Sequence, residues 1–198
     1  MSVRLPGSGS LANGLLGALL ATLVLLSPAA NAGKKEDLAE GFRLLQEMDR
    51  LVAKGAWGGV ERAYINLCAL DGMPVSPEVH LLAAQASRQR GDLTTTWVRL
   101  KRVLEIDGLH EAAHLQIATI EVNYAYVTVK IHRRWKGDRT LEALDLGFTP
   151  EYHTVVGLAR GSLEETGRYD GLLPLGRYRL GYEDFEVIGG LPVDILVK

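Results

Sequence analysis

The hydrophobic pattern changes its period once along the chain, near residue 121, and this change limits the possible folds more than any other feature. From residue 35 to 121, apolar residues recur every three or four positions, which is typical of amphipathic helices. From residue 124 onward, apolar and polar residues alternate, as in strands with one buried face. We therefore expect an α+β protein, with a helical domain at 33–121 and a strand domain at 122–198.

Turn residues divide the first half into five helices. The first helix is expected to stop at Gly55, the second at Asp71-Gly72 and the third at Gly91. Ser76 before Pro77 is typical of the start of the third helix, because serine caps well and proline suits the first helical position. The fourth helix is expected to begin after Asp92 and to end at 107–108, and the fifth to cover about 110–121. Short connections of this kind predict antiparallel helical hairpins.

The helix stops repeat with a fixed spacing. Gly91 follows Gly55 by 36 residues, and Gly108 follows Gly72 by the same number. A helix–turn–helix unit repeated at such a period is typical of a helical solenoid. The stretch 91–112, with Trp97 and the run 103–108, resembles a tetratricopeptide repeat (TPR) in its second helix and the start of the next unit.

The resemblance to the TPR family has two departures and one functional implication. Gly108 stands where the family usually has proline, and Arg99 occupies a position usually held by alanine. The resemblance implies a binding scaffold whose groove is formed mainly by the first helix of each hairpin. We expect four polar residues in or near that groove to contact a partner: Tyr64, Asn66, Gln85 and Arg88.

The second half is predicted to form a small antiparallel β-sandwich. Turn signals separate short apolar runs at 124–131, 141–148, 154–158, 177–182, 184–188 and 193–197. The segment 172–180, with Pro174, Gly176 and Tyr178, resembles a hairpin of carboxypeptidase-regulatory-like and PEGA-like sandwiches, and Tyr178 is expected to face the core. In those families such domains are generally non-catalytic accessory or adhesive modules.

The polar segment 132–139 between two predicted strands suggests an alternative function. It contains a group of basic and aromatic residues, namely Arg133, Arg134, Trp135, Lys136 and Arg139. Because tryptophan stacks on sugars and arginine pairs with phosphate, this tip could bind a carbohydrate or a cell surface. The other interpretation is a solvated hairpin tip with Trp135 packed under the sheet.

The first 32 residues have the features of a signal peptide. Arg4 precedes an apolar stretch at 11–26, and Ala30-Asn31-Ala32 matches the pattern that a signal peptidase reads. We expect cleavage after Ala32, a periplasmic or secreted protein, and no transmembrane segment in the remaining chain; the alternative is an uncleaved N-terminal anchor. The net charge of −2 gives no basic field for nucleic acid.

One motif suggests metal chemistry. Residues 110–114 read His-Glu-Ala-Ala-His, in which His110 and His114 could chelate zinc on one helix face with Glu111 as the base. A third ligand would then be needed from Glu121, Glu142, His132 or His153. The alternative is a pair of helix-surface histidines at the start of a repeat.

The remaining chemistry of the sequence favours binding over catalysis. Cys68, the single cysteine, lies on an apolar helical stripe and is expected to be buried. The sequence contains neither a phosphate-binding loop nor a serine-hydrolase elbow, so no catalytic residue and no cofactor is expected. The leading hypothesis is a non-enzymatic exported adaptor that binds a protein or peptide partner in the bacterial cell envelope through its TPR-like helices.

Overall fold

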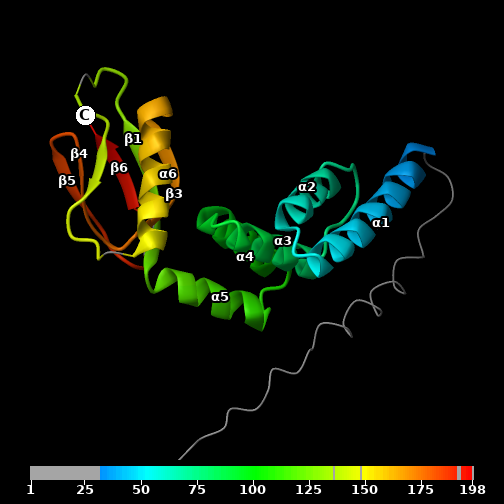
Figure 1. Cartoon of the computed structure of the whole chain (residues 1–198). Helices are drawn as coiled ribbons and strands as arrows, with labels where there is room; N and C mark the ends of the chain where they lie inside the picture. The colour runs from blue at the N-terminus through cyan, green and yellow to red at the C-terminus, as the bar shows by residue number, and fades with distance from the viewer. Residues whose placement is uncertain (1–31, 136, 148, 191–192, 198) are drawn as a thin grey trace, which may run out of the picture.

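The computed structural model describes residues 32–197 apart from 136, 148 and 191–192, so the predicted signal peptide lies, except for Ala32, outside the described residues. Within that part the chain forms six helices and six strands, which confirms the α+β class (Figure 1). The helices are α1 (Ala32–Ala53), α2 (Trp57–Cys68), α3 (Pro77–Gln89), α4 (Leu93–Ile106), α5 (Glu111–Glu121) and α6 (Pro150–Thr166). The strands are β1 (Tyr124–Ile131), β2 (Leu141–Ala143), β3 (Arg168–Pro174), β4 (Gly176–Leu180), β5 (Glu183–Val187) and β6 (Val193–Val197). Among the described residues, no helix is both long and apolar enough to cross a membrane.

The first five helices follow the prediction closely. Gly55, Gly72 and Gly91 adopt positive φ angles of 64°, 73° and 77°, which glycine reaches without strain at the end of a helix. Asp92 caps α4 as predicted, since its Oδ1 accepts a hydrogen bond of 2.9 Å from the backbone N–H of Thr95. Each of α1 to α4 packs against the next helix in the chain, and α5 then connects this array to β1 (Figure 1).

The strands form two three-stranded sheets. In the first sheet, with the order β3-β1-β6, β1 runs antiparallel to β3 and parallel to β6. In the second sheet, with the order β2-β4-β5, both pairings are antiparallel. The prediction of purely antiparallel strands is therefore wrong at β6. Tyr178 faces the core as expected: it is fully buried, and its hydroxyl donates a 2.7 Å hydrogen bond to the carbonyl of Pro174.

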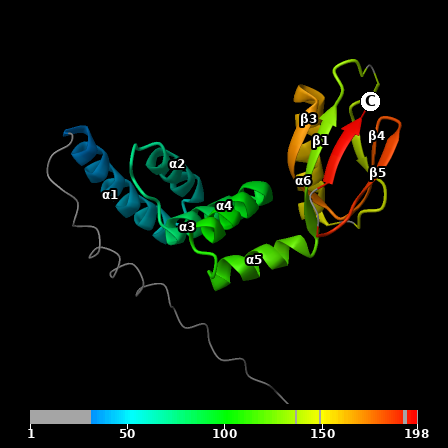
Figure 2. The same ribbon diagram turned by 180° about the vertical axis from the view of Figure 1, so that it is seen from behind.

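The run 154–158, predicted as a strand, lies instead within helix α6. Pro150 occupies the first turn of this helix, and the buried residues Val155, Val156, Ala159 and Leu163 follow helical spacing. The helix packs against β3 and also contacts β1 and β2, and it runs alongside the first sheet in both views (Figures 1 and 2). Of the described residues in the predicted strand 141–148, Leu141–Ala143 are the ones paired in a sheet.

Two apolar clusters form the core. The first joins α1, α2 and α3, and includes Leu44, Met48 and Val60. The second is larger and extends without interruption from α4 and α5 into both sheets. It includes Leu100 of α4 and Leu172 of β3. The division into two domains at residue 121 remains a prediction, and one apolar cluster extends across it.

Polar and aromatic contacts fix helix α4 against the first sheet. The hydroxyl of Thr94 accepts a 3.0 Å hydrogen bond from the backbone N–H of Leu172. The ring of Trp97 stacks on Tyr126 of β1 at a centroid distance of 5.1 Å. The Trp97 Nε1–H also donates to a carboxylate oxygen of Glu121 at 3.1 Å. Helix α4 therefore contacts both the other helices of the array and the first sheet.

Candidate functional site

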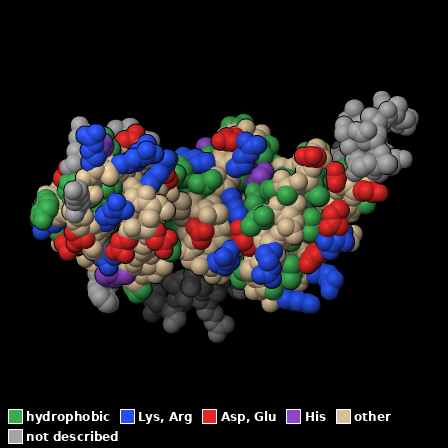
Figure 3. All heavy atoms as spheres, turned by 90° about the horizontal axis from the view of Figure 1, so that it is seen from above, with side chains coloured by type: hydrophobic (Ala, Val, Ile, Leu, Met, Phe, Trp, Pro, Cys, Tyr) green, Lys and Arg blue, Asp and Glu red, His purple; other side chains and the backbone are tan. Residues whose placement is uncertain are grey.

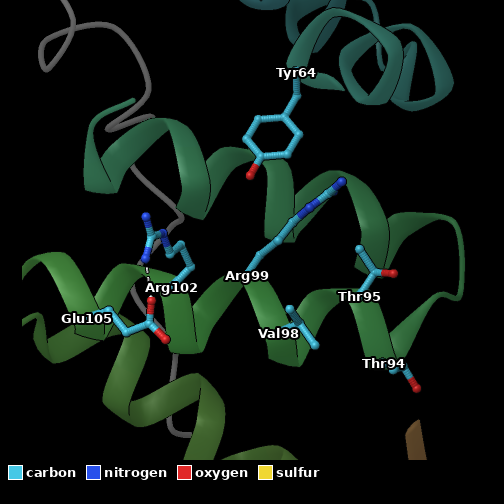
Figure 4. A pocket seen from close by; sticks show the side chains of 7 residues that line it. All are labelled: Tyr64, Thr94, Thr95, Val98, Arg99, Arg102 and Glu105. Carbon is cyan, nitrogen blue, oxygen red and sulfur yellow. Dashed lines mark hydrogen bonds and ion pairs between the residues drawn. The ribbon is translucent and has the colours of Figure 1, made fainter. Parts of the chain in front are cut away.

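A cavity of about 450 Å³ lies between helices α2 and α4. Tyr64 contributes from α2, and the other lining residues, all on α4, are Thr94, Thr95, Val98, Arg99, Arg102 and Glu105 (Figure 4). The α4 residues recur at helical spacing, so the cavity occupies one face of that helix. We call this cavity and its two helical walls the α2/α4 groove.

Tyr64 is the one residue of α2 among those that line the cavity, and its neighbours at a spacing of three and four lie on the same helix face. Glu61, Tyr64, Ile65 and Cys68 share one face of the helix. The hydroxyl of Tyr64 is 2.8 Å from Nδ1 of His80 on α3, and Ile65 is exposed. Cys68 is exposed as well, so the prediction of a buried cysteine is wrong. Cys68 lies on the same side of α2 as the exposed Ile65, whereas its neighbour Leu67 is buried in the apolar cluster of α1, α2 and α3.

A buried ion pair connects the walls of the groove. The guanidinium of Arg99 binds both carboxylate oxygens of Glu61, at 2.5 and 2.7 Å. The same guanidinium donates to the carbonyl of Ala83 at 2.8 Å and to the hydroxyl of Ser87 at 2.5 Å. Its carbon lies 4.4 Å from the centre of the Tyr64 ring. Through these contacts Arg99 links α2, α3 and α4, and its donors are largely occupied within the protein.

The groove holds fixed charges at neutral pH. The hydrogen bonds from Arg99 keep the pKa of Glu61 below its ordinary value. Burial raises the pKa of Tyr64 to about 12. Burial, together with the nearby charges of Arg102 and Arg99, lowers the pKa of His80. Glu61 is therefore ionised at neutral pH, while Tyr64 and His80 are neutral.

The rim of the groove carries a second, exposed ion pair. Arg102 and Glu105, one turn apart on α4, are 2.5 Å apart and both largely exposed. Among the residues that line the cavity there is no histidine or cysteine, and Glu105 is the single carboxylate. Over the face of the molecule seen from above, acidic and basic side chains are interspersed (Figure 3).

The structure places the four predicted partner-binding residues in different surroundings. Tyr64 lines the cavity, whereas Asn66, Gln85 and Arg88 are exposed and do not line it. Gln85 and Arg88 lie one turn apart on α3, and whether they contact a partner remains a prediction. Sequence reasoning missed the six lining residues on α4. One signal was available: Arg99 stands where the TPR pattern usually has alanine.

The basic tip at 132–139 is only partly free to bind. Arg133 and Arg134 are exposed, whereas Trp135 is half-buried. The Trp135 ring packs so closely on Gly137 and Gly181 that a Cβ at either glycine would lie 2.6 Å from it. The Trp135 Nε1–H donates to the carbonyl of Asp138 at 3.2 Å. Two further residues belong to the predicted tip site: Lys136 lies outside the described residues, and Arg139 is half-buried.

The two histidines of the zinc motif are engaged in local contacts. Helix α5 begins at Glu111, and His110 caps it through a 3.3 Å hydrogen bond that its Nδ1 accepts from the N–H of Ala113. His114 Nε2 lies 2.9 Å from the carbonyl oxygen of Gly108. In the part of the chain that the structure describes, no three His, Cys, Asp or Glu side chains come together as a metal site.

Comparison with known proteins assigns no family. No protein-family model matches the sequence, and neither a curated protein nor a solved structure matches it.

Proposed function

We propose that this protein is a non-enzymatic adaptor that binds a segment of a protein or peptide partner in the α2/α4 groove. The observation that carries the proposal is the 450 Å³ cavity, lined by an aromatic ring, an exposed valine and an arginine–glutamate pair. Tyrosine and arginine in a concave, partly apolar setting are the residue types that contribute most to protein interfaces. A lining whose charges are already paired or fixed suits recognition better than catalysis.

The construction of the groove supports a binding role. Arg99 is held by Glu61, Ser87 and a backbone carbonyl, so the α4 wall is fixed relative to α2 and α3. On its other side, α4 is held to the sheet by Thr94 and Trp97. A wall held from both sides loses little conformational entropy on binding, which favours affinity.

We also propose that the helices form a TPR-like array and that the protein is exported to the cell envelope. We treat α1–α5 as a TPR-like array, because the helices pack in chain order and their turns repeat every 36 residues. The apolar stretch and the Ala30-Asn31-Ala32 pattern support export to the bacterial cell envelope.

The single cysteine provides a direct test. Cys68 is exposed and lies one turn beyond Tyr64, so a photoreactive maleimide attached there reports on the groove. The full chain is purified, labelled at Cys68, mixed with an envelope extract of its own cells and illuminated. We expect one discrete polypeptide to be cross-linked, and its identity is read by mass spectrometry.

Two variants of α4 make the cross-linking test specific. Val98 lines the groove with 47% of its surface exposed, and Ile106 on the same helix is 46% exposed but does not line it. Val98→Arg should remove the cross-linked species, because a bulky charge fills the apolar part of the groove, whereas Ile106→Arg should leave it unchanged. A species that persists with Val98→Arg, or the absence of any species with the wild-type chain, contradicts the proposal.

Fewer residues are available for the alternative function, which is binding of a carbohydrate or a cell surface by the tip at 132–139. A carbohydrate- or surface-binding role of the tip depends on Arg133 and Arg134, because the Trp135 ring is already packed against the protein. In that case the label on Cys68 would capture no partner, and replacing both arginines would release the protein from its surface.

A further inference from the structure

We infer that His80 is an acid-sensitive switch of the α2/α4 groove: when its imidazole takes up a proton, the contact between the end of α2 and the start of α3 loosens, and Tyr64 leaves the groove lining. The switch is a property of the chain itself, whereas its consequence, release of the partner on acidification, rests on the proposed function. Three features support it, namely the burial of His80, its hydrogen bond with Tyr64 and the charges that face it.

His80 joins α3 to the one residue of α2 that lines the cavity. The histidine is 7% exposed, and its Nδ1 lies 2.8 Å from the hydroxyl of Tyr64. The two rings are also in edge contact, with centroids 5.7 Å apart and planes at 75°. A phenol is the better donor and an imidazole nitrogen the better acceptor of this pair, so we assign the hydroxyl as the donor.

A proton on His80 removes this acceptor and leaves a charge in the protein interior. Both ring nitrogens of an imidazolium are donors, so the Tyr64 hydroxyl can no longer donate to Nδ1. The hydroxyl can turn and accept, but its own hydrogen must then go to the Cys68 thiol, which is a weak acceptor. The buried imidazolium also lacks water to solvate it, which is unfavourable unless a carboxylate pairs with it. The closed arrangement therefore favours neutral His80.

The charges that face His80 from α4 are positive. Helix α3 packs mainly against α2 and α4. Burial, followed by the charges of Arg102 and Arg99, lowers the pKa of His80 below its ordinary value of 6.5. Arg99 is fixed by its bonds to Glu61, and its guanidinium carbon lies 4.4 Å from the centre of the Tyr64 ring. An imidazolium at this position is therefore repelled by a cation that is held in place.

The carboxylates of the three helices and their caps are engaged elsewhere or lie on another face. They are Glu61 on α2, Glu78 on α3, and Asp92, Glu105 and Asp107 on or at the ends of α4. Glu61 and Glu105 bind Arg99 and Arg102, while the two aspartates accept from the backbone N–H groups of Thr95 and Leu109. Glu78 precedes His80 by two positions, which places it on a different face of α3. An imidazolium at His80 thus gains solvation by moving towards water.

Acidification therefore favours an open arrangement of this part of the groove. An opened histidine in water has the ordinary pKa of 6.5, so below this pH the open form takes up the proton more readily than the closed form. Glu61, one turn before Tyr64, keeps a lowered pKa and its bond to Arg99, which confines the opening to the end of α2. Tyr64 points from α2 towards Arg99 across the groove, so its displacement changes the cavity (Figure 4).

A fluorophore on Cys68 tests the switch in the full chain without any partner. Cys68 is exposed and lies one turn beyond Tyr64, so an environment-sensitive label there reports on this end of α2. Protonation of His80 is followed in parallel by NMR of its ring. We expect the fluorescence to change reversibly on acidification with the same midpoint as His80, below pH 6.5, while the helical circular dichroism signal stays constant.

Two variants and a matched control assign the effect to this histidine. His80→Asn can still accept from Tyr64 but does not titrate, so it should abolish the fluorescence change. Tyr64→Phe removes the hydroxyl and keeps the ring; the midpoint of His80 should rise towards 6.5, since the neutral form loses its hydrogen bond. His114→Asn is the control: His114 on α5 is exposed, with Nε2 2.9 Å from the carbonyl oxygen of Gly108, so the midpoint should not change.

The switch is wrong if the fluorescence change persists in His80→Asn, or if His80 takes up its proton without a change at Cys68. Release of the partner is measured separately, with the photoreactive label on Cys68 at neutral and acid pH. We expect the cross-linked species to be lost on acidification in the wild-type chain and retained in His80→Asn. Equal capture at both pH values would leave the proposed function standing and contradict the regulation. Capture at neither pH would contradict the proposed function, and the fluorescence result would still decide whether His80 is a switch.

Discussion

The two faces of helix α4 are stabilised by different kinds of contact. Toward α2 and α3, the link is the buried ion pair of Arg99 and Glu61, which Ser87 completes. Toward the sheets, Leu100 belongs to the continuous apolar core that includes Leu172. An ion pair depends on the position of individual atoms, whereas an apolar core tolerates apolar replacements of similar volume. The groove thus lies on the side of α4 where the Arg99–Glu61 ion pair, and not the apolar core, fixes the position of the helix.

The same comparison explains why a binding surface can form on this helix. An apolar contact between α2 and α4 would close the space between them, because apolar side chains pack to high density. The guanidinium of Arg99 instead lies below Tyr64 and leaves a cavity beside it. The sheet side then fixes α4 in place.

The largest effect is expected when the ion pair loses its cation. Arg99→Ala leaves the nearly buried Glu61 carboxylate with the Ser87 hydroxyl at 3.5 Å and, as its remaining cation, Arg90 at 3.7 Å. Breaking a buried pair in this way costs about 3–5 kcal/mol of unfolding free energy, to be measured by urea denaturation. The double variant Glu61→Leu with Arg99→Met should recover most of this loss, because well-packed apolar residues can replace a buried ion pair. A loss below about 1 kcal/mol would mean that the pair behaves as an exposed one.

On the sheet side, the contact that depends most on geometry is the hydrogen bond to Thr94. Thr94→Val keeps the shape of the side chain but leaves the N–H of the buried Leu172 without its acceptor, which should cost about 1–3 kcal/mol. Thr119 on α5 is the control: it is exposed, its hydroxyl bonds within its own helix, and Thr119→Val should change stability by less than about 0.5 kcal/mol. Equal costs would show that this bond does not connect α4 to the sheet.

A smaller effect is expected from pH. Burial and two arginines lower the pKa of His80 in the folded chain from its ordinary value of 6.5. The unfolded chain therefore binds more protons in the window between the lowered value and 6.5. Stability should rise with pH through this window and fall on acidification. His80→Asn, which can still accept a bond from Tyr64, should make the pH dependence less steep, as followed by thermal unfolding; identical slopes would contradict the assignment.

The smallest effect is expected at the basic tip. Replacing both Arg133 and Arg134 by alanine removes exposed side chains, so stability should change by less than about 0.5 kcal/mol. The amount of partner cross-linked through Cys68 should also stay the same. If the double variant loses the partner, the function belongs to the tip and not to the groove.

The helical half could be predicted because its signals are local. Positive-φ glycines such as Gly55 and the capping Asp92 mark helix ends in the sequence itself. Helix α6 was missed because residues 154–158 include three adjacent β-branched residues, which favour a strand, and because Gly157 and Gly161 weaken a helix. The stronger signals were Thr149-Pro150 and the helical spacing from Val155 to Leu163.

The parallel pairing of β6 and the candidate site could not be predicted because both are set by tertiary contacts. β6 pairs with β1, whose partner residues lie 66 positions earlier in the chain, and no local pattern specifies that direction. The groove combines α2 with α4, which are separated in the chain by α3. Arg99 was recognised as unusual, but its partner Glu61 could not be identified without the packing of the helices.

Hydrogen–deuterium exchange of the full chain, with and without its cross-linked partner, tests the central claim most directly. The account predicts slower exchange in α2 (Trp57–Cys68) and α4 (Leu93–Ile106) when the partner is bound, with no change at residues 132–139. Protection confined to the tip, or to the exposed face of α3 that carries Gln85 and Arg88, would contradict it.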